Sequence, residues 1–143
     1  MSHTGSCLCG AVTFTASELP SEAGACHCKM CRRHSGGVFI ALRVPKGKIT
    51  YSGSDNIGTF ASSEWAERGF CKTCGSTLFY RVTASGRFRG DYHIAFGTLD
   101  DQSGITLSQE LFIDRKPAGY AFAGDRKTMT EAEVFAMFAP PQK

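Results

Sequence analysis

Residues 26–33 read Cys26-His27-Cys28-Lys29-Met30-Cys31-Arg32-Arg33, with three cysteines at C-x-C-x-x-C spacing. This spacing puts three sulfur atoms within reach of a single metal ion. Thiolate is a soft ligand that suits zinc, and a structural zinc site closes with four such ligands. The stretch therefore predicts a zinc site on Cys26, Cys28 and Cys31 whose fourth position is open unless a histidine fills it. The histidines considered for that position are His27, His34 and His93, with His3 less favoured because it lies in a chain terminus expected to be mobile.

The other four cysteines form two pairs that lie far apart in the sequence. Cys7 and Cys9 make a C-x-C pair near the start, and Cys71 and Cys74 make a C-x-x-C pair in the middle. If the fold brings the pairs together, they supply the four thiolates of a closed structural zinc site. The seven cysteines then divide into one closed site and one open site, and an open zinc position is what chemistry requires.

Disulfide bonds are the main alternative use of these cysteines. The number of cysteines, seven, is odd, and residues 1–10 are polar, without the apolar core of a signal peptide. In a reduced chain, this density of cysteine favours metal binding over disulfides. We therefore expect two zinc ions as cofactors and a cytoplasmic location.

The length and charge of the chain narrow the choice of partners. At 143 residues the chain is expected to form one domain over 1–143. Its net charge of +3 gives little reason to expect nucleic acid or an acidic membrane as a partner, and seven thiolates on two zinc ions would make it less basic still. No apolar run approaches the length that spans a bilayer.

Short β-prone segments between glycine-bearing turns make up most of the chain. Val12, Phe14 and Ala16 alternate with polar or small residues, which predicts a half-buried strand after the first cysteine pair. Gly10 would allow a sharp turn that points amide hydrogens at sulfur. Residues 18–24 are expected to form a loop, and 38–51 a hairpin. Further strands are expected at 57–61, 76–82, 92–96 and 107–114, so the fold class is mainly β, with several short antiparallel strands.

Two segments have helical signals. Residues 29–34 are expected to form a short helical turn that Gly36 and Gly37 end. Near the C-terminus, Thr130 and Glu133 fit a capping box, with Met129 and Val134 placed as a hydrophobic staple. This C-terminal helix is expected to bury Val134, Phe135, Met137 and Phe138, and to stop at Pro140-Pro141.

Further motifs occur in order along the chain around the three-cysteine stretch. They are Gly5-Ser6-Cys7-Leu8-Cys9-Gly10, Arg68-Gly69-Phe70-Cys71 with Cys74-Gly75-Ser76, Gly97-Thr98-Leu99-Asp100 and Phe112-Ile113-Asp114-Arg115-Lys116-Pro117. Together with the three cysteines, Arg32-Arg33 and Gly36, they resemble the glutathione-dependent formaldehyde-activating enzyme family, which also includes the centromere protein V domain. The resemblance covers most of the chain. It departs at Ala118-Gly119, where many relatives carry a tryptophan.

The resemblance implies a β-tent fold with a closed zinc on Cys7, Cys9, Cys71 and Cys74. It also implies a second zinc on Cys26, Cys28 and Cys31, at or near the active site, so these three cysteines are the expected catalytic residues. The implied activity is that of a carbon–sulfur lyase acting on glutathione and formaldehyde, with S-hydroxymethylglutathione as the adduct. A glutathione-like thiol and an aldehyde are therefore the expected partners, and a dimer is possible.

The charge of a three-thiolate zinc site favours a thiol at the open position. Zinc with three thiolates carries a net charge of about minus one and is a weak Lewis acid, so it is better suited to hold a thiolate nucleophile than to polarise a carbonyl. Lys29, Arg32 and Arg33 could pair with carboxylates of such a thiol, or form a solvated face. His34 and His93 are conceivable proton carriers.

Other function classes remain open at this point. The chain could be a non-catalytic zinc-stabilised binding module, or a zinc or redox sensor that releases metal when its cysteines are oxidised. Binding of nucleic acid is disfavoured because Arg81, Arg87 and Arg89 do not form a long basic stripe with interleaved aromatic residues. Hydrolysis by zinc-bound water is also disfavoured, because three thiolates make that water less acidic than three imidazoles do.

Overall fold

The computed structural model describes residues 2–138 and confirms the expected mainly β fold with a short C-terminal helix. The strands are β1 (His3–Ser6), β2 (Thr13–Ala16), β3 (Glu22–Cys26), β4 (Phe39–Val44), β5 (Ile49–Ser52), β6 (Ile57–Ser63), β7 (Ala66–Cys71), β8 (Thr77–Val82), β9 (Tyr92–Ala95), β10 (Thr106–Leu111) and β11 (Lys127–Met129). The helices are α1 (Lys29–Ser35) and α2 (Glu131–Phe138), with short 3-10 helices η1 (Ser54–Asn56), η2 (Phe96–Thr98) and η3 (Ile113–Arg115).

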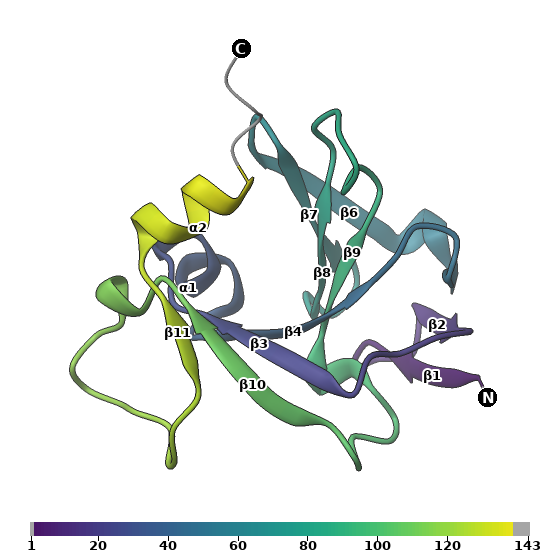
Figure 1. Ribbon diagram of the computed structural model, residues 1–143. Helices are drawn as coiled ribbons and strands as arrows, with labels where there is room; N and C mark the ends of the chain where they lie inside the picture. The colour runs from purple at the N-terminus through teal and green to yellow at the C-terminus, as the bar shows by residue number, and fades with distance from the viewer. Residues whose placement is uncertain (1, 139–143) are drawn as a thin grey trace.

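The strands form two sheets. The smaller has the order β1-β2-β5, and the larger has the order β11-β10-β3-β4-β9-β8-β7-β6. Most neighbours pair antiparallel, but β10 lies parallel to both β3 and β11. In Figure 1, β3 and β10 run at a steep angle to β7 and β8, and both helices lie towards the β11 end. The larger sheet therefore bends, and α1 lies close to the bend.

Two clusters of buried side chains join the sheets. One contains Phe14 of β2 with Leu42 and Ile94 of the larger sheet. The other contains Cys7, Val12, Cys71, Leu78 and Phe79, so it holds one cysteine from each of the two distant pairs. The contact between the sheets thus includes residues of the predicted closed zinc site.

The local predictions around the first cysteine pair are confirmed. Val12, Phe14 and Ala16 are all buried, as the alternation predicted. Gly10 has a φ of +81°, in the left-handed region that glycine adopts readily. The turn directs the Val12 N–H at the Cys7 sulfur, at 3.3 Å. This segment folds as its sequence predicts because its signals are local.

Both helices were placed correctly, but the burial of α2 was only partly right. Gly36 ends α1 in the left-handed conformation. The capping box is confirmed, because the Thr130 N–H donates to the Glu133 carboxylate and the Glu133 N–H donates to the Thr130 hydroxyl. Val134 and its staple partner Met129 are buried.

The expected burial of Phe135 and Met137 is wrong. These residues are 48% and 47% exposed, although the Phe135 ring contacts the rings of Trp65 and Phe112. The prediction of a helix end at Pro140-Pro141 lies outside the described residues, as does any statement on the side chain of Phe138.

Three other expectations are wrong, the first two because strand pairing there depends on partners that are distant in the sequence. The expected loop 18–24 becomes strand β3 from Glu22, where Ala23 and Ala25 alternate inward between β4 and β10. The expected hairpin at 38–51 does not form: β4 pairs with β3 and β9, while β5 pairs with β2 of the other sheet. The residues around His3 form strand β1 against β2 rather than a mobile terminus.

Gly5 lies where β1 approaches β2 and the end of η2. A Cβ atom at Gly5 would lie 2.3 Å from both the Phe14 ring and the Thr98 carbonyl oxygen. We expect Gly5→Ala to lower the free energy of unfolding by about 1–3 kcal/mol, as overpacking does. Urea unfolding measures this, with Gly97→Ala as control because nothing lies within 4 Å of a Cβ there. Equal losses in the two variants would contradict the prediction.

Candidate metal centres and active site

The structure brings the two distant cysteine pairs together. Cys7 and Cys9 lie in the turn after β1, while Cys71 ends β7 and Cys74 lies in the turn before β8. All four sulfur atoms lie within 4.8 Å of one another. The Sγ atoms of Cys7 and Cys9 are 3.7 Å apart, and those of Cys9 and Cys71 are 3.8 Å apart. Sulfur atoms about 2.3 Å from a tetrahedral zinc lie about 3.8 Å from one another, so this group could hold such an ion.

Neutral hydrogen-bond donors surround this four-cysteine group. The Val12 N–H donates to Cys7 Sγ at 3.3 Å, and the Asn56 amide donates to Cys71 Sγ at 3.1 Å. Ser76 lies 3.1 Å from Cys74 Sγ, and this hydrogen bond lowers the pKa of Cys74 to about 5. Such donors stabilise thiolates without adding charge. The group is closed by its own four thiols and lies between the two sheets, which fits a structural role.

The second group comes from one short segment. Cys26 ends β3, Cys28 is the N-cap of α1, and Cys31 lies in the first turn of α1. Their sulfur atoms lie within 4.8 Å of one another, and no histidine, aspartate or glutamate of residues 2–138 joins them. The three thiols therefore come together as predicted, with no fourth ligand from the described chain.

The thiols of this three-cysteine group affect one another's ionisation. Hydrogen bonding between Cys26 and Cys28 raises the pKa of Cys26 and lowers that of Cys28. One thiolate therefore forms readily, and the others ionise only with difficulty beside it. A bound cation removes this penalty. The chemistry of the donor set thus fits a metal ion that thiolate ligands prefer, such as zinc.

The histidines considered as a fourth ligand are engaged elsewhere. His27 is fully buried, with Nε2 donating to the Glu110 carboxylate and Nδ1 lying 2.8 Å from the Tyr120 hydroxyl. Burial lowers the pKa of His93 to about 4, and the Arg43 cation adds to the shift. The pKa of His34 is also lowered by burial, with a contribution from Arg68. Both of these rings are therefore neutral at pH 7. Their role as proton carriers stays a prediction.

His27 belongs to a buried polar network that the sequence did not reveal. Its partner Glu110, on β10, also accepts a hydrogen bond from Arg126 at 2.8 Å. Burial raises the pKa of Glu110, but the hydrogen bonds from His27 and Arg126 outweigh it and hold that pKa below its ordinary value. Since His27 lies between Cys26 and Cys28, the network fixes the cysteine-bearing loop from the side of residues 110–126.

Arg68 is the second site residue that the sequence did not reveal. It lies in the Arg68-Gly69-Phe70-Cys71 motif, but its distance in sequence from the three cysteines does not indicate that it contacts them. The Arg68 side chain is buried, and its guanidinium donates to Cys31 Sγ at 3.4 Å and, through Nε, to the Ser62 hydroxyl at 3.2 Å. The guanidinium carbon lies 5.1 Å from the centre of the Tyr80 ring.

A row of paired residues extends from Arg68 across the larger sheet. Arg68 pairs with Tyr80, Tyr80 with His93, and His93 with Arg43, so the four side chains share one face. The rings of Tyr80 and His93 contact edge to face, with centroids 5.5 Å apart. Arg68 and Tyr80 are the residues of this row that lie near the three-cysteine group.

The cations of α1 divide into one structural residue and two exposed ones. Arg32 donates from Nε to the His27 carbonyl oxygen at 2.9 Å, which holds the cysteine loop. Lys29 and Arg33 are exposed on the helix that carries Cys31. Of the three cations that could pair with a substrate or form a solvated face, Lys29 and Arg33 are thus the ones with accessible charges.

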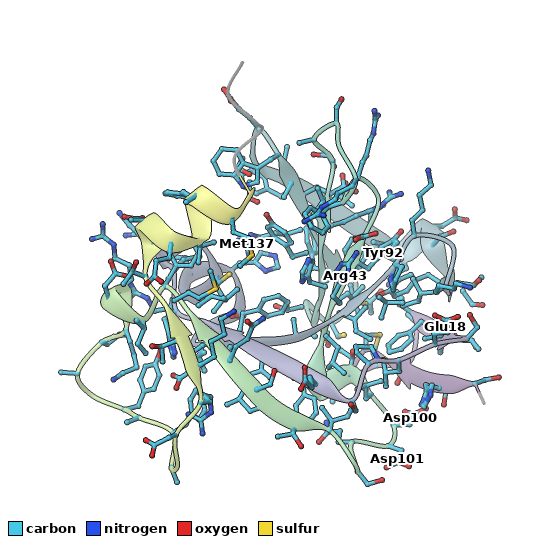
Figure 2. The ribbon with its side chains drawn as sticks, viewed as in Figure 1. Glu18, Arg43, Tyr92, Asp100, Asp101 and Met137 are labelled. Carbon is cyan, nitrogen blue, oxygen red and sulfur yellow. The ribbon has the colours of Figure 1, made fainter. Side chains whose placement is uncertain are left out.

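Two hollows on the surface lie away from the cysteines. One, of about 280 Å³, is lined by Glu18, Leu19, Pro20, Arg43 and Pro45, and a smaller one is lined by Lys46, Arg81, Val82, Thr83, Arg89 and Gly90. Figure 2 shows Glu18 well apart from Met137, which lies at the end of α2. Neither hollow includes a residue of the two cysteine groups. Among the described residues, no helix is long and apolar enough to cross a membrane.

Comparisons with known proteins agree with this geometry. The profile of the glutathione-dependent formaldehyde-activating enzyme family matches residues 2–115. An uncharacterized lyase of Schizosaccharomyces pombe is 34% identical over 132 residues, which cover 92% of this chain and 93% of that protein. A putative glutathione-dependent formaldehyde-activating enzyme of Halomonas elongata is 30% identical over 83 residues, covering 52% of this chain and 53% of its own length. A crystal structure of a Rhodobacter sphaeroides protein is similar with a TM-score of 0.56 and 26% identity, over 68% of this chain and 87% of that one.

The two cysteine groups should differ in their effect on stability. The four-cysteine group joins two sheets, whereas Cys26, Cys28 and Cys31 come from one segment. Structural zinc contributes about 10–16 kcal/mol and a domain's net stability is about 5–15 kcal/mol, so we expect Cys71→Ser to unfold the chain. Cys31→Ser should keep the native circular dichroism spectrum. Thermal melts of both variants test this, and equal loss of stability would contradict the division into two kinds of site.

Glu110→Gln removes the charge that pairs with His27 and Arg126. We expect the free energy of unfolding to fall by about 1–3 kcal/mol at pH 7, because buried donors lose a charged acceptor. Since the folded pKa of Glu110 is lowered, the carboxylate stabilises fully above its ordinary pKa of about 4.3, and this contribution is lost as pH falls through the folded value. The deficit should therefore shrink in acid.

Urea unfolding at pH 7 and at several acidic values measures this difference. Glu131→Gln is a suitable control, because Glu131 forms its ion pair with Arg115 at the surface. A deficit for Glu110→Gln that stays constant as the pH falls would contradict the role of its carboxylate.

Proposed function

The chain belongs to the glutathione-dependent formaldehyde-activating enzyme family, and from this we propose that it catalyses the addition of a thiol to an aldehyde at the three-cysteine group. The proposed substrates are glutathione or a related thiol and formaldehyde or a related small aldehyde. The product is a hemithioacetal such as S-hydroxymethylglutathione, so in the reverse direction the activity is that of a carbon–sulfur lyase. The supporting observation is that Cys26, Cys28 and Cys31 gather three thiols, with no fourth ligand from residues 2–138.

Zinc fits the thiol donors of both cysteine groups. In this proposal Cys7, Cys9, Cys71 and Cys74 hold a structural ion, and Cys26, Cys28 and Cys31 hold a second one. When bound to the three cysteines, zinc would keep an incoming thiol in its thiolate form at neutral pH. The part of the three cysteines in catalysis would therefore be to hold that ion while leaving room for the substrate thiol.

The proposed reaction is balanced without an oxidant or a reductant. The substrate sulfur forms a bond to the carbonyl carbon as the π bond of the carbonyl group breaks. The electron pair moves to the carbonyl oxygen, which takes up the proton that the thiol has lost. Tyr80 is available as a hydroxyl donor near the cysteines, since burial raises its pKa to about 12 and keeps it protonated.

Exposed cations on α1 would bind the rest of the thiol substrate. Glutathione carries two carboxylates, and Lys29 and Arg33 are exposed on the helix of Cys31. Charged hydrogen bonds of this kind orient a substrate as well as attract it. Arg32 has less freedom to do so, because its Nε is bonded to the His27 carbonyl oxygen.

Exchange NMR on glutathione with formaldehyde tests the proposal. The adduct forms without an enzyme, so the exchange rate in buffer is the baseline. We expect the zinc-loaded protein to accelerate exchange and Cys31→Ser to return the rate to that baseline. Met30→Leu, at a half-exposed neighbouring position, should keep the native rate. No acceleration with zinc confirmed at both sites would contradict the proposal and favour a binding module or a redox sensor.

A further inference from the structure

The two cysteine groups have different electrostatic surroundings. The four-cysteine group accepts hydrogen bonds from neutral donors, including the Val12 N–H and the Asn56 amide. The three-cysteine group has one such backbone bond, from the Cys31 N–H to Cys28 Sγ at 3.3 Å. Its other donor is the guanidinium of Arg68, which carries a full positive charge. The three-cysteine group therefore accepts a hydrogen bond from a cation, whereas the four-cysteine group accepts hydrogen bonds from neutral donors.

Arg68 is a buried cation whose charge no carboxylate compensates. Its side chain is 3% exposed, and none of the ion pairs among residues 2–138 includes it. Burial of an isolated charge is costly unless an opposite charge lies close by. The Ser62 hydroxyl and the Tyr80 ring hold the guanidinium but are neutral at pH 7. The negative charge that balances Arg68 must therefore come from the cysteine thiolates.

The formal charges show what Arg68 changes. Zinc on three thiolates has a net charge of about −1, and a substrate thiolate would make it about −2. With Arg68 in contact, the corresponding totals are about 0 and −1. A second anion is hard to add to a partly buried centre of like charge, because the local dielectric is low. The guanidinium therefore favours an anionic ligand over neutral water at the open position.

We propose that Arg68 is the residue that makes the three-cysteine site selective for a thiolate ligand, by balancing the charge of the cysteines through its contact with Cys31. This inference rests on the proposed function in one respect, that a metal is held by Cys26, Cys28 and Cys31. Arg68 acts on the sulfur of the substrate whatever the rest of the thiol is. It is thus distinct from Lys29 and Arg33, whose exposed charges suit substrate carboxylates.

Thiol binding to cobalt-loaded protein tests Arg68 without a measurement of turnover. The protein is loaded with one equivalent of zinc, which binds thiolates more tightly than cobalt, and then with one of cobalt, with occupancy checked by metal analysis. Added thiol increases the sulfur-to-cobalt charge-transfer absorption, which gives a dissociation constant. The probes are uncharged 2-mercaptoethanol and glutathione.

The informative variants are Arg68→Met, which removes the charge, and Arg68→Lys, which keeps it. We expect Arg68→Met to weaken the binding of both thiols about 10–100-fold, as loss of a residue that supports metal ligands does. Arg68→Lys should recover most of that loss. Arg81→Met is the matched control, because Arg81 also lies over an aromatic ring, that of Tyr92, but is not hydrogen-bonded to a cysteine.

Unchanged thiol affinity in folded Arg68→Met would overturn the proposal. So would a loss confined to glutathione, since that would assign Arg68 to a carboxylate. If Arg68→Met does not fold, the test is made on the native protein by NMR. The signal of the Arg68 Nε–H group should shift when 2-mercaptoethanol is added, while that of the Arg81 Nε–H group should not. An unshifted Arg68 signal also overturns the proposal.

The outcome is separable from that of the proposed function. Normal thiol binding that depends on Arg68, without acceleration of glutathione–formaldehyde exchange, would refute the reaction and keep the role of Arg68. Acceleration by a native protein whose thiol affinity does not depend on Arg68 would do the reverse.

Discussion

The requirement that clustered thiolates be balanced by positive charge is the constraint on which this structure depends. It acts first at the four-cysteine group, which joins the turn after β1 to the turn between β7 and β8. Because the two turns belong to different sheets, their connection sets how the smaller sheet lies on the larger one. A metal at this group would therefore connect segments that are more than 60 residues apart.

Strand β7 contributes a residue to each of the two groups. Cys71 ends the strand and faces the core cluster between the sheets, whereas Arg68 contacts Cys31 on α1. Residues three apart on a strand point to opposite faces, so the position of Cys71 also sets the position of Arg68. The register of β7 thus places Cys71 in the four-cysteine group and Arg68 beside the three-cysteine group. The His27–Glu110–Arg126 network does the same for the cysteine loop from the opposite direction.

The sequence predicted the features that depend on neighbouring residues, and it did not predict those that depend on residues far apart in the chain. The clustering of Cys26, Cys28 and Cys31, the turn at Gly10, the end of α1 at Gly36 and the cap of α2 depend on local sequence, and all are confirmed. The pairing of β5 with β2 and the parallel position of β10 are set by distant partners, so no short pattern contains them. The contact of Arg68 with Cys31 joins residues 37 apart, and that of His27 with Glu110 joins residues 83 apart. The sequence does not distinguish a buried arginine or glutamate from an exposed one. For this reason Arg68 and Glu110 were not identified as site residues.

The difference between neutral donors and a full charge also supports the proposal that the two cysteine groups have different roles. A closed group has one ligand state, so N–H donors fixed by the turns are sufficient to stabilise it. An open group changes its charge by one unit whenever a thiolate enters or leaves. Arginine keeps its charge throughout, and its burial costs less free energy when thiolates lie beside it. Arg68 and the three cysteines are therefore mutually dependent, and the same interaction that allows the arginine to be buried prepares the group for an anionic ligand.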